Sequence, residues 1–282
     1  MLIFAGTTLG QTGYNFGVQK WRVEHENELK ADTGWLTVVG LFWLKDGNNT
    51  IGSGAGFDIE LTENFKTGNF GVIEFKNGKG VLTVGEGVEA TVDGNAVQRV
   101  ELRSDENGKP NVVKTGTQSF YLIKRENRYG IRLKDTNSKP RREFTHSKWY
   151  GIDPKLRVTA KFERYAEQTE VSIPKVMGGD FKMKSPGLVK FKLNGQPVRL
   201  QTVDEGDGRL FIIFRDLTSK TTTYGAGRFL YADKPEGDTA VLDFNKAENP
   251  PCAFTSFATC PVAPKQNRLE LEIRAGEKRY HQ

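Results

Sequence analysis

Asn-Gly and Asp-Gly pairs recur along this chain and separate short runs of apolar residues. The pairs are Asp46-Gly47, Asn77-Gly78, Asp93-Gly94, Asn107-Gly108, Asn194-Gly195 and Asp207-Gly208. A tight hairpin turn needs positive φ angles, which Asn, Asp and Gly tolerate best, so these pairs are typical of antiparallel hairpins. With 31 glycines in 282 residues, the composition agrees with many tight turns. We therefore predict an all-β fold apart from one helix near the N-terminus.

That helix is predicted from a periodic pattern close to the start of the chain. Trp21, His25 and Leu29 recur at every fourth position and share one face of a helix. Gly34 ends the pattern. We predict a helix over residues 19–34.

The first ten residues are interpreted as the remnant of a secretory signal peptide. An apolar run at residues 2–6 is followed by Thr8-Leu9-Gly10, which places small residues at positions −3 and −1 before Gln11. No other segment approaches the ~20 apolar residues of a membrane span. We expect an extracytoplasmic protein, periplasmic or secreted. The alternative is a cytoplasmic protein with a frayed N-terminus.

Residues 35–135 are predicted to form an antiparallel β-sandwich, because apolar runs recur there about every 8 to 12 residues. The runs at residues 49–53 and 57–61 resemble the opening strands of the forkhead-associated (FHA) fold. The phosphothreonine site of that fold needs an arginine after its first glycine and a Ser-x-x-His motif in a later loop. Here Ser53 follows Gly52, and the matching loop at residues 66–70 has neither an arginine nor a histidine. Phosphopeptide binding is therefore not expected.

The remainder of the chain is predicted to form a second antiparallel β domain over residues 149–282, after a polar connector at residues 136–148. Residues 157–162 and 189–193 alternate between apolar and polar, as half-buried strands do. The continuous apolar run at residues 210–214 predicts a fully buried central strand. The simplest architecture is a partial barrel or a curled sheet.

The most distinctive segment lies within residues 221–268 and carries both cysteines of the chain. Its motifs are TYGAGRFLY at residues 223–231, LDFN at 242–245, NPPCAFT at 249–255, TCP at 259–261 and NRL at 267–269. These motifs closely resemble the C-terminal signature of a bacterial and fungal family, the domain-of-unknown-function family 1684. The resemblance implies a family and no activity.

Cys252 and Cys260 have three interpretations, which the sequence leaves open. A disulfide would close a small loop and suit an extracytoplasmic protein. Two buried thiols would be inert packing residues. A reactive Cys252 would need a cation to stabilise its thiolate, and Arg228 and Arg268 are the candidates. The family resemblance favours the interpretations without a disulfide.

Arg228 is the predicted anchor of a ligand site. Gly225 and Gly227 allow a ligand to approach the backbone closely, and a planar guanidinium suits a carboxylate or a phosphate. The alternative is a buried ion pair between Arg228 and Asp243 on a neighbouring strand. The other predicted ligand-binding residues are Tyr224, Asn245, Asn249 and Arg268.

These residues favour a protein that binds a small polar or anionic molecule in its C-terminal domain. The first alternative is a hydrolase or an acyl-transfer enzyme with Cys252 as nucleophile and Asp243 as the candidate base. The second alternative is a protein-interaction module that uses the sandwich. The sequence does not indicate an oligomeric state.

Several other classes of site are not predicted. The three histidines, His25, His146 and His281, lack metal-ligand spacing, so no metal is expected. No phosphate-binding or dinucleotide-binding glycine motif is present, so no cofactor is expected. The net charge is +6, but basic and acidic residues are interleaved along the chain. This pattern is typical of a solvated surface and not of a nucleic-acid-binding protein.

Overall fold

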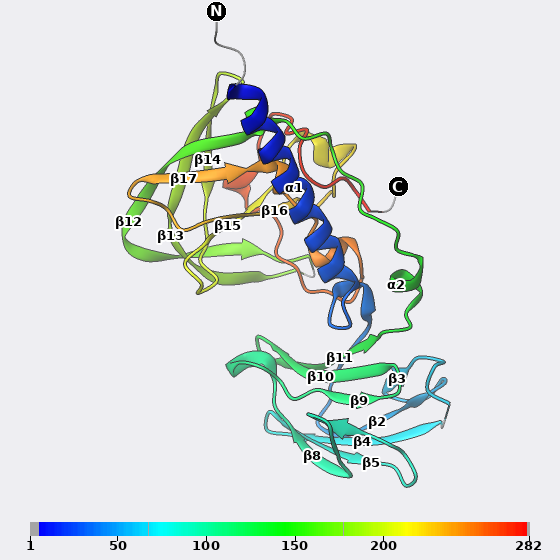
Figure 1. Ribbon diagram of the computed structural model, residues 1–282. Helices are drawn as coiled ribbons and strands as arrows, with labels where there is room; N and C mark the ends of the chain where they lie inside the picture. Colours follow the sequence, from blue (N-terminus) through cyan, green and yellow to red (C-terminus); the bar gives the residue numbers. More distant parts are fainter. Residues whose placement is uncertain (1–5, 67, 177, 281–282) are drawn as a thin grey trace, which may run out of the picture. The chain divides into compact units, whose positions relative to one another are not determined.

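The computed structural model describes residues 6–66, 68–176 and 178–280 and divides the chain into two compact units. Unit 1 combines residues up to 27 with residues from 145 onward, and unit 2 comprises residues 28–144. Most regular structure is β-strand, and none of the described sheets closes into a barrel (Figure 1). The predicted class, all-β with one N-terminal helix and antiparallel sheets, is confirmed.

Unit 2 is a sandwich of two sheets. The first sheet has the strand order β1 (Val38–Trp43), β11 (Arg128–Asp135), β10 (Gln118–Arg125), β9 (Val113–Thr115), β6 (Thr91–Val92) and β7 (Asn95–Ala96). The second has the order β3 (Ile59–Leu61), β2 (Gly47–Ser53), β4 (Asn69–Lys76), β5 (Lys79–Val84) and β8 (Arg99–Leu102). Buried side chains of both sheets, such as Ile73, Leu82, Phe120 and Ile131, form one core. Apolar residues that alternate along each strand therefore meet in the interior.

Unit 1 contains most of the helix α1 (Gly6–Lys30) and two further sheets. The larger sheet has the order β14 (Gln196–Gln201), β13 (Asp180–Leu193), β12 (Arg157–Pro174) and β17 (Thr239–Asp243). The smaller sheet pairs β15 (Leu210–Phe214) with β16 (Arg228–Ala232). Phe162 and Leu200 of the larger sheet share a core with Ile212 and Leu230 of the smaller sheet. All five residues of β15 are buried, as predicted. It is nevertheless not a central strand, because its sheet has two strands.

The remaining described elements are short. They are α2 (Lys139–Glu143), η1 (Trp35–Thr37), η2 (Asp105–Asn107), η3 (Pro154–Leu156), η4 (Leu217–Lys220), η5 (Phe244–Lys246), η6 (Pro251–Ala253) and η7 (Lys265–Asn267). Three of them, η5, η6 and η7, lie in the segment with the family motifs.

The helix α1 (Gly6–Lys30) is longer than predicted and begins before residue 19. Glycines at positions 10, 13 and 17 have low helix propensity, which hides the N-terminal half of this helix from a pattern analysis. Residues 1–5 of the predicted signal-peptide remnant lie outside the described residues, and residues 6–10 belong to α1. Among the described helices, none is long and apolar enough to cross a membrane.

Three of the predicted hairpin turns have the backbone that their sequences require. The turn between β4 and β5 has φ angles of 53° at Asn77 and 78° at Gly78. The corresponding pairs at residues 93–94 and 194–195 also have positive φ at both positions. The hairpin predicted at Asn107-Gly108 is wrong, because Asn107 ends the 3₁₀-helix η2. There the side chain of Ser104 accepts a hydrogen bond from the amide of Glu106 and caps the helix.

Candidate functional site

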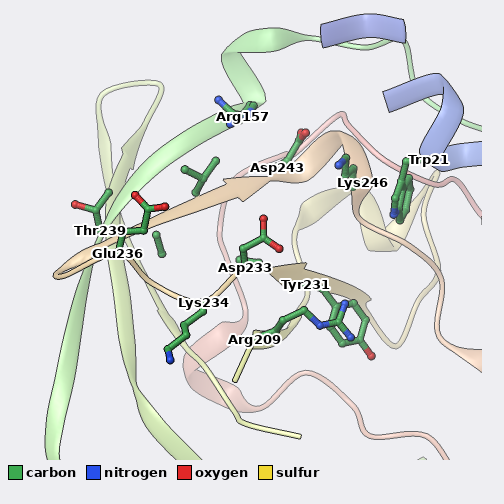
Figure 2. A pocket seen from close by; sticks show the side chains of 13 residues that line it. Trp21, Arg157, Arg209, Tyr231, Asp233, Lys234, Glu236, Thr239, Asp243 and Lys246 are labelled. Atoms are coloured by element: carbon green, nitrogen blue, oxygen red, sulfur yellow. The ribbon is translucent and has the colours of Figure 1, made fainter. Parts of the chain in front are cut away.

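A cleft of about 530 Å³ opens in unit 1 beside the strands β16 and β17 (Figure 2). The strand β17 is at the edge of the four-stranded sheet, and β16 is one of the two strands of the smaller sheet. The residues that line the cleft are Trp21, Arg157, Arg209, Tyr231, Ala232, Asp233, Lys234, Glu236, Thr239, Ala240, Val241, Asp243 and Lys246. The cleft is thus formed by α1, by three strands of two different sheets and by the loops that join them.

Charged side chains of both signs line this cleft. The cations are Arg157, Arg209, Lys234 and Lys246, and the carboxylates are Asp233, Glu236 and Asp243. No ion pair among the described residues involves Arg157, Lys234 or Lys246. Three positive charges at the cleft therefore have no neutralising contact of their own.

One wall of the cleft is the ring of Tyr231, which lies beside the side chain of Arg209 (Figure 2). The guanidinium carbon of Arg209 is 4.9 Å from the ring centroid, and its Nε donates to Asp207 at 2.7 Å. Burial raises the pKa of Tyr231, and the negative charges of Glu205 and Glu248 raise it further. The phenol therefore stays protonated and neutral, and its ring offers an apolar surface.

A second wall contains Asp243, one of the residues singled out in the sequence. The hydroxyl of Tyr14 on α1 donates to Asp243 Oδ1 at 2.8 Å. Asn245 Nδ2 lies 3.0 Å from the Tyr14 hydroxyl oxygen and 3.1 Å from Asp243 Oδ1, and it donates to both. Burial is the largest cause that raises the pKa of Tyr14, and the hydrogen bond to Asp243 adds to it. The structure thus brings the predicted residues Asp243 and Asn245 together, with Tyr14 as their shared partner.

The third wall is Trp21, which stacks on His25 one helical turn later. Their ring centroids are 5.5 Å apart and the rings are nearly parallel. His25 Nδ1 lies 3.4 Å from Glu248, and its Nε2 lies 3.6 Å from Glu277. His25 is therefore packed behind the cleft and between two carboxylates. His146 is exposed, and His281 lies outside the described residues.

Arg228 is not among the residues that line the cleft. Its side chain is fully buried, and its Nη2 lies 3.4 Å from Asp216 and donates to the carbonyl of Ile273 at 3.0 Å. Its Nη1 donates to the carbonyl of Ala275. The ion-pair partner is therefore Asp216 and not Asp243. Burial lowers the pKa of Arg228, whereas the negative charge of Asp216 raises it.

The close packing of β15 and β16 explains why a glycine, Gly227, precedes Arg228. Gly227 has a φ of 116°, and a Cβ atom at this position would lie 2.6 Å from the carbonyl oxygen of Phe214 on β15. Glycine is needed here because the backbones of β15 and β16 approach closely.

The other predicted residues are held by neighbouring groups of unit 1. The hydroxyl of Tyr224 donates to the carbonyl of Cys252 at 3.2 Å, and the amide of Cys252 donates to Cys260 Sγ at 3.0 Å. Asn249 Nδ2 donates to the carbonyl of Lys278 at 2.8 Å. Arg268 is exposed, and its Nε donates to the carbonyl of Ala263 at 3.2 Å. Tyr224, Cys252 and Cys260 thus form one cluster.

Sequence analysis identified only Asp243 among the residues that line the cleft. The three cations without an ion pair come from β12, η5 and the loop after β16, and they share no local motif. Each resembles an ordinary exposed charge in the sequence, so spacing gives no signal for the site. Within the described part of the chain, no group of three His, Cys, Asp or Glu residues is placed to hold a metal ion.

Part of the chain matches a family without a known activity. Residues 142–278 match the family described as "Protein of unknown function (DUF1684)", which confirms the predicted resemblance for this region. No curated protein matches the sequence. One similar solved structure is the solution NMR structure of an uncharacterized protein from Haloarcula marismortui. It is 27% identical, with a TM-score of 0.42, and the match covers 50% of this chain and 80% of that chain.

Proposed function

We propose that the cleft beside β16 and β17 binds a small polar molecule that carries an anionic group. The cleft is formed by α1 and by the region that matches DUF1684. The observation that carries the proposal is the set of cations Arg157, Lys234 and Lys246, which take part in no ion pair among the described residues. Cations that converge on a concave surface attract an anion and raise its local concentration.

The size of the cleft supports a small molecule as the ligand. Its volume of about 530 Å³ lies within the ~300–1,000 Å³ typical of small-molecule sites. Trp21 and Tyr231 form two aromatic walls, and Ala232, Ala240 and Val241 are small or apolar. An apolar part of a ligand would contact these side chains while its anionic group meets the cations.

The carboxylates restrict the kind of ligand further. Asp233 and Glu236 line the same cleft and are exposed, so they repel a ligand that is negative over its whole surface. They accept hydrogen bonds from hydroxyl or amino groups. The cleft therefore suits a molecule with one or two acidic groups and several hydrogen-bond donors, such as a hydroxy acid.

The proposal is tested with tartrate as the probe, a hydroxy acid with two carboxylates and two hydroxyl groups. We expect saturable shifts of the backbone amide NMR signals of residues in β16 and β17 and of the indole signal of Trp21. Arg157→Gln and Lys246→Gln should each weaken binding about tenfold to a hundredfold, because a charge-assisted hydrogen bond contributes about 1.5–3 kcal/mol. Lys220→Gln, at an exposed cation of η4 away from the cleft, serves as the matched control.

Two results would contradict the proposal. One is tartrate-induced shifts that are equal in the wild type and in Arg157→Gln. The other is that NMR shifts appear near every exposed cation, Lys220 included, and fade as sodium chloride is added. Such a result would indicate nonspecific electrostatic attraction that salt screens.

A further inference from the structure

The two cysteines of unit 1 lie within contact distance of each other. The amide of Cys252, in η6, donates to Cys260 Sγ at 3.0 Å, and Cys252 Sγ donates to the carbonyl of Ala258 at 3.4 Å. Because an N–Cα bond is about 1.46 Å long, Cys260 Sγ lies within about 4.5 Å of the Cα atom of Cys252. This distance places Cys260 Sγ within reach of the Cys252 side chain, as an intramolecular disulfide requires.

We propose that Cys252 and Cys260 are a redox pair that interconverts between two thiols and an intramolecular disulfide. The oxidant is a low-molecular-weight disulfide, and the proposal is independent of the ligand cleft. The structure has both residues as thiols and therefore corresponds to the reduced state.

The backbone around both cysteines is already ordered for this bond. Pro250 and Pro251 precede Cys252, and the amide of Ala253 donates to the carbonyl of Pro250 at 2.9 Å. On the other side, the carbonyl of Cys260 accepts a hydrogen bond from the amide of Val176 at 3.1 Å. Because prolines and hydrogen bonds hold both ends of the loop, closing the disulfide requires little further loss of chain entropy.

Exposure determines which sulfur reacts first. Cys252 is half-buried, whereas Cys260 is 4% exposed. The Cys252 thiolate attacks one sulfur of the external disulfide, whose S–S bond breaks, and one small thiolate leaves. The Cys260 thiolate then attacks the Cys252 sulfur, and the second small thiolate leaves. In total, the two cysteines lose two electrons and two protons, and the external disulfide is reduced to two thiols.

Tyr224 supplies a reporter for the reaction, because its hydroxyl donates to the carbonyl of Cys252 at 3.2 Å. Burial is the largest cause that raises the pKa of Tyr224, and the charges of Cys252 and Cys260 raise it further. A disulfide carries no thiolate charge. The pKa of Tyr224 should therefore be lower in the oxidised protein than in the reduced protein, although burial keeps it above its ordinary value.

The first experiment uses the full-length wild-type chain and needs no variant. The reduced protein is incubated with glutathione disulfide, quenched with acid, unfolded without reductant, alkylated with iodoacetamide and measured by intact mass spectrometry. We expect the number of alkylated thiols per chain to fall from two to none, with no glutathione attached and no covalent dimer. Two alkylated thiols after prolonged exposure, or a glutathione adduct that persists, would overturn the proposal.

A second experiment tests the order of attack. Cys260→Ser should accumulate one glutathione on Cys252, whereas Cys252→Ser should take up glutathione at Cys260 far more slowly. Equal rates in the two variants would refute the assignment of Cys252 as the first sulfur to react. Urea midpoints of both variants, measured beside the wild type, identify any variant that reacts only because it has unfolded.

Discussion

The carboxylate of Asp216 lies 3.4 Å from the guanidinium of Arg228, and both side chains are fully buried. Asp216 also accepts a hydrogen bond from the amide of Ile273 at 2.6 Å and from the hydroxyl of Thr218 at 2.8 Å. Arg228 donates in turn to the carbonyls of Ile273 and Ala275. The ion pair therefore connects β16 to the loop after β15 and to the C-terminal segment of unit 1.

We expect Arg228→Met and Asp216→Ala each to lower the free energy of unfolding by about 3–5 kcal/mol, because each leaves an uncompensated charge in the interior. Urea unfolding followed by circular dichroism measures the loss. The control is Arg274→Ala, at the exposed pair of Arg274 and Glu272, which should change the free energy by less than about 1 kcal/mol. If Arg228→Met keeps the wild-type midpoint but weakens tartrate binding, Arg228 is a ligand anchor, as the sequence indicated.

Asn267 gives a second test of buried polar packing, in the NRL motif. Its Oδ1 accepts from the amide of Gln201 at 2.7 Å, and its Nδ2 donates to the carbonyls of Gln201 and Ile213, both at 2.9 Å. The side chain of Asn267 thus connects the backbone of β14, at Gln201, to that of β15, at Ile213.

In Asn267→Asp, a carboxylate would face the two carbonyl oxygens that now receive hydrogen bonds. We expect a loss of about 2–4 kcal/mol in the free energy of unfolding, since two buried acceptors lose their donor and an anion is buried without a cation. Gln266→Glu introduces the same charge at the adjacent exposed position and should be nearly neutral. Similar urea midpoints for the two variants would show that the bridging hydrogen bonds contribute little.

The sequence predicts the strands well where turn chemistry and alternation act together. Asn77-Gly78 and Asn194-Gly195 specify hairpins because few other residues tolerate positive φ at both turn positions. The strands β12 and β13 extend well beyond the predicted residues 157–162 and 189–193. Between the predicted and the outer parts the alternation is interrupted, in β12 by the register shift between Arg164 and Thr169 and in β13 by Pro186-Gly187, although backbone pairing continues beyond.

The candidate site is much harder to predict than the fold. Arg228 and Asp216 belong to different elements, and no spacing rule indicates that they meet. Arg157 is brought to the cleft only because β12 pairs with β17, where Arg157 lies opposite Asp243. Register between strands distant in sequence depends on packing of the whole unit, which a single sequence does not reveal.

Tyr14 joins the helix α1 to the cleft wall through Asp243 and Asn245. We expect Tyr14→Phe to lower the free energy of unfolding by about 1 kcal/mol, because Asp243 loses one donor and Asn245 loses one acceptor. Tyr165→Phe is the matched control, since its hydroxyl also donates to a single side chain, Gln201, at 2.9 Å. Hydrogen exchange of α1 should increase in Tyr14→Phe only, and equal exchange in both variants would contradict a role for Tyr14 in holding the helix.

Lys134 makes the stability of unit 2 depend on pH. Burial, with the nearby charge of Arg132 as the second cause, lowers the pKa of Lys134 from its usual 10.5 to about 8. Below about pH 8 the amine is charged in both the folded and the unfolded chain. The folded state then carries the full free-energy cost of burying this charge. Between about pH 8 and 10.5 the unfolded chain binds more protons, so the free energy of unfolding rises with pH.

We expect this rise to amount to about 1–2 kcal/mol, because Lys134 is half-buried and water screens part of its charge. Other groups titrate over the same range, so the informative quantity is the difference between the wild type and Lys134→Met. That variant should be more stable than the wild type at pH 7, and its advantage should shrink as the pH approaches 10. The control is Lys76→Met at an exposed position of β4, for which the difference should stay constant with pH. A constant difference for Lys134→Met as well would mean that the amine keeps its ordinary affinity for protons in the folded chain.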